Sequence, residues 1–256
     1  MVRNRRGVDV VAGKRVLVVG ASSGLGRGIA LCLAGAGARV AFSARRGDRL
    51  DAAVKEAGDP AFGVVGDVRN PEDCDRMVAE TVEHFGGLDA LVYCAAMGRL
   101  QMLADTDADL WLDTLQTNLI GASLVTRAAI AHLEAARGRA LYLTSDSANL
   151  TPPWPGLGAY IVSKAALHKM IDAWRAEHSG VAFTSVIVGP TAGDPASFSE
   201  FANAWDQDLA GKVMPTWIER GYMNGQLVDF ADLTGQITAI LGSGADLATV
   251  VVRPRA

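Results

Sequence analysis

Short, valine-rich apolar runs alternate with helix-length stretches along almost the whole chain. The runs that we expect to be strands are 14–20, 39–43, 61–66, 88–93, 139–145, 181–188 and 247–252. Continuous apolar strands separated by helices indicate a parallel sheet that is covered on both faces. We therefore predict an α/β fold with a doubly wound, seven-stranded parallel sheet.

Composition narrows the class of protein further. The chain has 256 residues, of which 50% are hydrophobic and 20% charged, so it can bury the core of one domain spanning 1–256. A net charge of −4 without a basic stripe argues against nucleic acid as a partner. The strand-like runs are shorter than the roughly 20 residues of a membrane span, so no membrane partner is expected.

Cysteine and histidine usage points to a reducing compartment. Cys32, Cys74 and Cys94 are far apart and form no CxxC pattern. This favours reduced thiols and a cytoplasmic location. The four histidines show no ligand-like grouping, and we expect no metal site.

A glycine-rich turn, 20–28, follows the first expected strand and leads into a helix expected over 29–34. Glycines allow a tight turn, and the helix N-terminus offers free N–H groups to a diphosphate. The placement between strand and helix therefore predicts a dinucleotide site. The same residues match the G-x-S-x-G elbow of serine hydrolases. That alternative is disfavoured, because only one strand precedes Ser22 and no earlier loop can supply the oxyanion donor.

The ends of the second and third strands bear on which dinucleotide binds. Arg45 and Arg46 stand where an acidic residue would bind a ribose 2'-hydroxyl, and arginine there accommodates a 2'-phosphate. We therefore predict NADP, with NAD disfavoured. Asp67 could accept a hydrogen bond from the adenine amino group. Its alternative role is a cap for the helix beginning near Pro71.

Tyr160 and Lys164 are four residues apart in a stretch that reads as the start of a helix, which places both side chains on one face. A nearby ammonium favours the phenolate, so the pair could transfer protons near neutral pH. Taken alone, the spacing is also compatible with a surface tyrosine packed on a lysine stem.

An aromatic-rich segment, 191–228, interrupts the alternation of strands and helices. We expect a lid over a substrate pocket at the carboxyl ends of the strands, and the alternative is a satellite hydrophobic cluster. The side chains that suggest an apolar or cyclic ketone or alcohol as substrate, unless they serve core packing, are Trp154, Phe198, Phe201, Trp205, Met214 and Trp217.

Taken together, the motifs resemble the short-chain dehydrogenase/reductase family over nearly the whole chain. They are the turn at Gly20, Gly24 and Gly26, the pair Asp67-Val68, the run 118–121, a serine near 145, and Tyr160-x-x-x-Lys164. The resemblance implies a Rossmann fold and an NADP(H)-dependent oxidoreductase acting on a carbonyl or secondary alcohol of a small molecule. It also implies a homo-oligomer, a dimer or tetramer. The alternative is a non-catalytic NADP-binding regulatory protein.

The resemblance also implies a role for each catalytic residue. Tyr160 would be the general acid or base, and Lys164 would lower the pKa of its phenol and bind the nicotinamide ribose. Asn118 would steady the helix and join a water-linked proton relay. Strand register favours Ser145 as the catalytic serine, whereas the thirteen-residue interval to Tyr160 favours Ser147. We prefer Ser145.

The cofactor would contact residues on most of the strand ends. They are Gly20, Ser22, Ser23, Gly24, Leu25, Gly26, Arg45, Arg46, Asp67, Val68, Cys94, Ala95, Tyr160, Lys164, Pro190 and Thr191. The chain departs from the family pattern where Tyr93-Cys94 replaces two asparagines, which removes side-chain hydrogen bonds between neighbouring strands. Gly189-Pro190 inverts the usual order.

Overall fold

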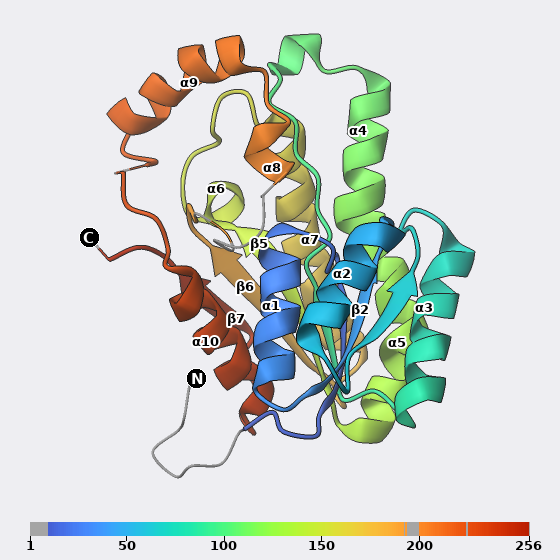
Figure 1. Cartoon of the computed structure of the whole chain (residues 1–256). Coiled ribbons are helices and arrows are strands. Elements are labelled where there is room, and N and C mark those ends of the chain that lie inside the picture. The colour runs from blue at the N-terminus through green and yellow to red at the C-terminus, as the bar shows by residue number, and fades with distance from the viewer. Residues whose placement is uncertain (1–9, 192, 194–199, 224, 256) are drawn as a thin grey trace.

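A seven-stranded sheet forms the centre of the molecule, seen in a computed structural model that describes residues 10–191, 193, 200–223 and 225–255 (Figure 1). All strands pair in parallel, in the order β3-β2-β1-β4-β5-β6-β7. The strands are β1 (Arg15–Val19), β2 (Arg39–Ala44), β3 (Phe62–Val65), β4 (Ala90–Tyr93), β5 (Arg139–Ser145), β6 (Ala182–Val188) and β7 (Thr249–Val252). The predicted doubly wound sheet is confirmed, each strand lying within a few residues of its expected range.

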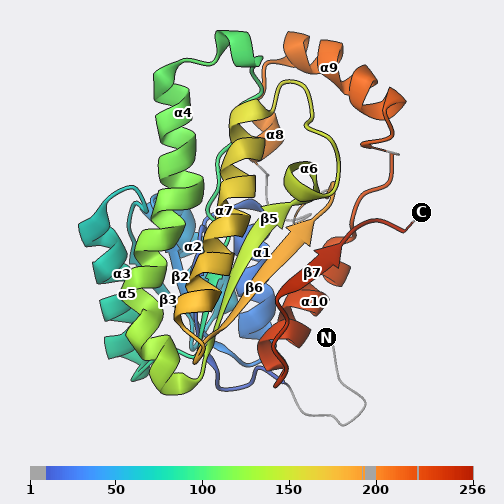
Figure 2. The same cartoon turned by 180° about the vertical axis from the view of Figure 1, so that it is seen from behind.

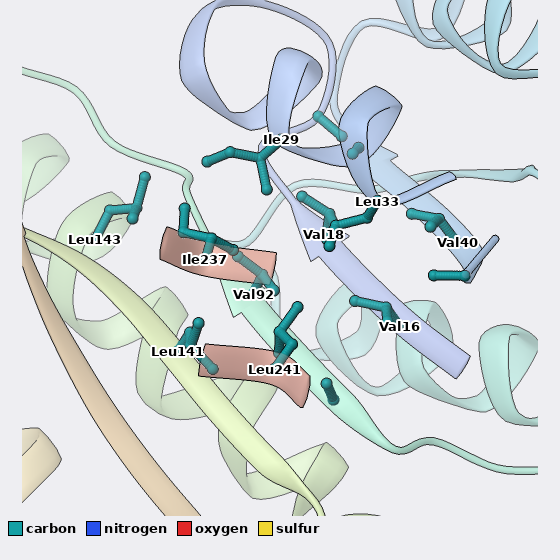
Figure 3. Packing of buried hydrophobic residues seen from close by; sticks show 14 of the residues in the cluster. Val16, Val18, Ile29, Leu33, Val40, Val92, Leu141, Leu143, Ile237 and Leu241 are labelled. Atoms are coloured by element: carbon teal, nitrogen blue, oxygen red, sulfur yellow. The ribbon is translucent and has the colours of Figure 1, made fainter. Parts of the chain in front are cut away.

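Two layers of helices cover the sheet. One face carries α1 (Gly24–Gly35), α2 (Gly47–Ala57) and α10 (Phe230–Gly242), and the other carries α3 (Pro71–Phe85), α5 (Gly121–Ala136) and α7 (Gly158–Glu177) (Figures 1 and 2). On the first face, Ile29 and Leu33 of α1 and Ile237 of α10 pack over Val18 and Val92 (Figure 3). Strands buried on both sides need no polar residues, which explains their unbroken apolar runs.

Helix α1 begins at Gly24, five residues before the expected start at Ile29. Glycine is a weak helix former, so the turn reads as non-helical in the sequence. Packing overrides that preference, because a Cβ atom on Gly26 would collide with the carbonyl of Gly20. The helix can therefore start this close to β1 only with glycine at position 26.

One long helix runs along the second face, from α4 (Ala108–Leu115) through a π-helical turn, η2 (Gln116–Ile120), into α5. It is 29 residues long and contains an 18-residue stretch with a mean hydropathy of 1.2, so it is long and apolar enough to span a membrane by length and composition alone. In the fold it packs against α3 and α7, as the core helix of a globular domain does. The bounds of this helix were not predicted, because the apolar runs of the sequence mark the strands only.

The aromatic-rich segment contains two helices, α8 (Glu200–Asn203) and α9 (Gln207–Glu219), which lie above the carboxyl ends of the strands (Figures 1 and 2). Trp217 of α9 packs with Trp154, Leu157 and Tyr222 in a separate hydrophobic cluster. A satellite cluster, the alternative to the expected lid, is thus present, and the lid and the single domain stay predictions. Residues 192, 194–199 and 224, including Phe198, lie outside the described part of the chain.

Candidate active site

A cavity of about 870 Å³ opens at the carboxyl ends of β1, β2, β4, β5 and β6. Segments that follow parallel strands meet at one edge of the sheet, which is where open α/β sheets bind ligands. Every predicted site residue lines this cavity except Asp67 and Asn118. The lining residues among the predictions are Gly20, Ser22, Ser23, Gly24, Leu25, Gly26, Arg45, Arg46, Val68, Cys94, Ala95, Ser145, Tyr160, Lys164, Pro190 and Thr191.

The glycine turn brings backbone close to backbone. Gly20 has φ of 91°, and a Cβ there would lie 2.6 Å from the amide nitrogen of Ala95. Its own amide and that of Ala21 both donate to the Ser43 carbonyl. These contacts fix the turn between β1 and α1 and place the start of α1 at the cavity, where the positive end of the helix dipole attracts an anion.

The two arginines after β2 have different partners. The Arg46 guanidinium donates to the hydroxyls of Ser22 and Ser23, at 3.0 Å and 2.8 Å. It therefore lies directly beside the glycine turn. The side chain of Arg45 is 58% exposed and lies 3.9 Å from the Asp67 carboxylate. Both guanidiniums line the end of the cavity nearest β2.

Asp67 does not cap α3. The cap is Asn70, whose side chain accepts from the amide of Glu72, while Asp67 accepts from the guanidinium of Arg69 at 2.8 Å. Burial alone would raise the pKa of Asp67, but the hydrogen bonds and charge of Arg69 leave it lowered. The capping alternative is thus wrong, because Asn70 stands next to the first helical residue and Asp67 is drawn to a cation.

Asn118 lies fully buried in the π-helical turn and holds two segments together. Its side-chain oxygen accepts from the Met97 amide at 2.8 Å, and its amide donates to the Met97 carbonyl and the Ser163 hydroxyl. Ser163 in turn donates to the Tyr160 carbonyl at 2.6 Å. Asn118 therefore ties the segment after β4 to the helix that carries Tyr160, and its part in a proton relay stays a prediction.

The two candidate serines contact each other. Ser145 ends β5 and Ser147 lies in the short helix α6 (Asp146–Asn149), with their hydroxyl oxygens 2.8 Å apart. Of the two serines, Ser145 is the one whose side chain acts on the phenol of Tyr160 and lowers its pKa. The structure therefore favours Ser145, and Ser147 is its hydrogen-bond partner.

Tyr160 and Lys164 share one face at the start of α7, with the ammonium 5.8 Å from the centre of the phenol ring. Lys164 is 3% exposed and donates to the Leu143 carbonyl at 2.8 Å. Burial lowers the pKa of Lys164 to about 8. Burial raises the pKa of Tyr160 to about 12. The charge of Asp146 raises this pKa further, and the Ser145 side chain lowers it.

The pKa of Tyr160 is thus raised, whereas we expected Lys164 to lower it. The physical reason is that the phenol is removed from water and the ammonium points to a backbone carbonyl. With a pKa near 12, Tyr160 is protonated at neutral pH. The side chain is thus prepared to donate a proton.

Aromatic side chains form the wall beside Tyr160. The ring of Phe201 from α8 lies 4.8 Å from that of Tyr160, edge to face, and Trp205 contacts Phe201 in the same edge-to-face geometry at 5.5 Å. Trp154 and Trp217 also line the cavity, and the Trp217 indole donates to the Pro155 carbonyl. Part of the aromatic segment therefore packs as core and part faces the cavity.

Two features were not predicted from the sequence, namely the place of Asp146 in the cavity wall and a hydrogen bond made by Tyr93. Asp146, between the serines, lines the cavity with an exposure of 2%. Tyr93, which replaces an asparagine of the family pattern, donates to the Thr117 carbonyl at 2.6 Å. This hydrogen bond links β4 to the π-helical turn, so the substitution keeps a polar connection between the two elements.

A model of the family described as short chain dehydrogenase matches residues 14–202, which contain the glycine turn, Asn118, both serines, Tyr160 and Lys164. The chain belongs to the short-chain dehydrogenase family. The family is one of oxidoreductases that use a nicotinamide cofactor, which fits a cavity spanning β2 to β6.

Individual relatives agree with this assignment. This chain is 37% identical over 193 residues to 11-beta-hydroxysteroid dehydrogenase-like 3 of Arabidopsis thaliana, covering 72% of this chain and 61% of that protein. It is 39% identical over 172 residues to 11-beta-hydroxysteroid dehydrogenase A of Arachis hypogaea, covering 65% and 49%. The chain thus spans 61% and 49% of the length of these two curated relatives.

Solved structures share the fold. A short-chain dehydrogenase from Streptomyces avermitilis has a TM-score of 0.80 at 26% identity, over 94% of this chain and 89% of that one. An alcohol dehydrogenase from Thermococcus sibiricus, complexed with 5-hydroxy-NADP, has a TM-score of 0.79 at 22% identity, over 94% and 96%. At that identity the second likeness shows the fold alone.

The buried ammonium should make stability depend on pH. The pKa of Lys164 is about 8 in the folded protein and 10.5 ordinarily, so the unfolded chain binds more protons between these values. The lowered pKa of Lys164 destabilises the folded state by its full amount below pH 8, and this penalty disappears as the pH rises towards 10.5. The variant Lys164→Met lacks the penalty, so it should have a higher unfolding free energy than the parent protein at pH 7. We expect this difference between the two proteins to be smaller by about 3 kcal/mol at pH 10.

Urea unfolding of both proteins across this range measures the effect. Lys169→Met, an exposed lysine on the same helix, is the matched control and should show no comparable trend. A difference between Lys164→Met and the parent protein that stays constant with pH would contradict the burial of a titrating ammonium.

Proposed function

We propose that the protein is an NADP(H)-dependent oxidoreductase that interconverts a carbonyl and a secondary alcohol on a small, apolar substrate. The observation that carries this proposal is that Ser145, Tyr160 and Lys164 line the same cavity as the glycine turn. When bound, the nicotinamide would supply or accept the hydride.

The cavity suits a phosphorylated dinucleotide. A Cβ atom on Gly20 or Gly26 would collide with neighbouring backbone, so these glycines let the turn pack tightly and place the start of α1 at the cavity, where its amides could face a diphosphate. Arg46 lies against Ser22 and Ser23 at the β2 end, where a ribose phosphate could accept from it. Lys164 lies at the other end with Tyr160, within reach of a ribose hydroxyl.

Tyr160 would hold and move the proton. In reduction, its hydroxyl donates to the substrate oxygen as negative charge develops there, and Ser145 holds that oxygen with a second hydrogen bond. The raised pKa keeps the phenol protonated before the step. The positive charge of Lys164, 5.8 Å from the ring, then favours the phenolate that remains.

The proposed substrate class is inferred from the aromatic side chains that line the cavity beside Tyr160. Phe201, Trp205 and Trp217 present apolar surface next to Tyr160, which favours an apolar or cyclic substrate. The names of the two relatives refer to 11-beta-hydroxysteroids, which are cyclic alcohols, and this supports the same choice of substrate class. A cytoplasmic location and a homo-oligomer stay predictions from the sequence.

We further propose that segment 191–228 acts as a lid. Residues of α8 and α9 line the cavity from above, so substrate has to pass them. Trypsin should cut after Lys212 and Arg220 more slowly when NADPH and a ketone are present together. Cleavage after Lys55, on the exposed side of α2, is the internal control. A segment that is already fully protected without ligand would indicate a permanent interface.

Arg46→Ala should reveal the cofactor preference. Loss of a charge-assisted hydrogen bond to a 2'-phosphate should weaken NADPH binding by about ten- to a hundredfold. NADH lacks that phosphate, so its affinity should change little. Fluorescence titration measures both, with Lys55→Ala on the neighbouring helix as control. Equal losses for the two cofactors would argue against recognition of the phosphate.

Tyr160→Phe tests the proton donor. We expect kcat for ketone reduction to fall by about a hundred- to ten-thousandfold, because the acid is removed. The affinity for NADPH should stay within about twofold, since the ring remains. Tyr222→Phe, in the neighbouring hydrophobic cluster, is the control. Unchanged turnover in Tyr160→Phe would refute the role, and NADPH binding without turnover in the parent protein would favour a regulatory protein.

A further inference from the structure

Asp146 is a buried carboxylate that the proposed reaction does not use. It is 2% exposed between Ser145 and Ser147. Among the residues that the structure describes, its Oδ2 atom has no hydrogen-bond donor. Burial raises the pKa of this carboxyl. An uncompensated buried carboxylate is unfavourable, so this position calls for a neighbouring positive charge.

Arg253 supplies that charge. Its Nε atom lies 3.6 Å from Oδ2 of Asp146, at the distance of an ion pair and too far for a hydrogen bond. The guanidinium side chain is 44% exposed and the carboxylate side chain 3%. The guanidinium of Arg253 thus lies at the surface, and the carboxylate of Asp146 lies in the interior of the site.

The segment that carries Arg253 also contacts the end of β6. The amide of Gly189 donates to the Val252 carbonyl at 2.9 Å, and a Cβ on Gly189 would lie 3.3 Å from Pro254. The segment following β7 therefore touches two turns that line the cavity, one after β5 and one after β6. It is placed to hold them in a fixed relation.

The backbone of Asp146 organises the turn after β5. Its carbonyl accepts from the amides of Leu150 and Thr151, at 2.8 Å and 3.1 Å. A shift of Asp146 would therefore move both the turn and the neighbouring Ser145. The charge of Asp146 also acts on Tyr160, which connects the ion pair to the phenol.

We propose that Arg253 is a positioning residue, which neutralises the buried carboxylate of Asp146 and so holds Ser145 in place against Tyr160. The proposal rests on the proposed function for its catalytic consequence. The ion pair itself stands on the geometry alone.

Four variants test the proposal: Arg253→Met, Asp146→Asn, the double variant, and Arg253→Lys. We expect Arg253→Met to lower kcat about tenfold, short of the hundredfold that a misplacement of about 1 Å can cause. KM should change less than kcat. In the double variant, removal of the carboxylate charge should restore kcat to the level of Asp146→Asn, and Arg253→Lys should retain most activity. Arg255→Met, an exposed arginine on the same segment, is the matched control.

Hydrogen exchange gives a second measurement that needs no substrate. The amides of Leu150 and Thr151 should exchange faster in Arg253→Met than in the parent protein. They should exchange alike in Asp146→Asn and in the double variant. If no ketone is turned over by the parent protein, the proposed function fails and the exchange data still decide the role of Arg253. The proposal is overturned if Arg253→Met behaves like Arg255→Met, or if it is equally harmful with and without Asp146.

Discussion

The single direction of the seven strands is the constraint on which the site depends. Parallel strands need a crossover through a helix, so each strand delivers its carboxyl end to the same edge of the sheet. For this reason one cavity is lined by residues at or just after the ends of five different strands, namely Gly20, Arg46, Ala95, Ser145 and Pro190. Residues more than a hundred positions apart in the sequence thereby become neighbours.

Burial then changes the chemistry of the groups that meet there. Lys164 loses part of its affinity for a proton, with a pKa of about 8, and Tyr160 holds its proton more firmly, with a pKa of about 12. Both shifts disfavour the charged form, as desolvation does. Asp146 adds a third buried group, and its carboxylate forms an ion pair with Arg253 from the segment after β7. Burial therefore sets the protonation of Tyr160 and Lys164, whereas at Asp146 it is partly offset by a neighbouring charge.

Much of this could be predicted from the sequence. Unbroken apolar runs such as 139–145 showed the buried strands, and the positions of the glycine turn, Tyr160 and Lys164 indicated one site at the strand ends. The start of α1 was missed, because glycine disfavours a helix until packing demands it. The direction of the pKa shift of Tyr160 was also missed, since a four-residue spacing shows proximity to Lys164 and says nothing of desolvation. Asp146 and Arg253 are 107 positions apart and only the fold brings them together.

The central claim is that a hydride moves directly between the cofactor and a carbonyl carbon in this cavity. It is tested most directly by reducing a ketone with NADPH that carries deuterium at C4 of the nicotinamide, and analysing the alcohol by mass spectrometry and NMR. The account predicts deuterium on the carbinol carbon, and none there when unlabelled NADPH is used in deuterated water. An alcohol that takes its carbon-bound hydrogen from the solvent, or NADPH that binds without any ketone being reduced, would contradict it.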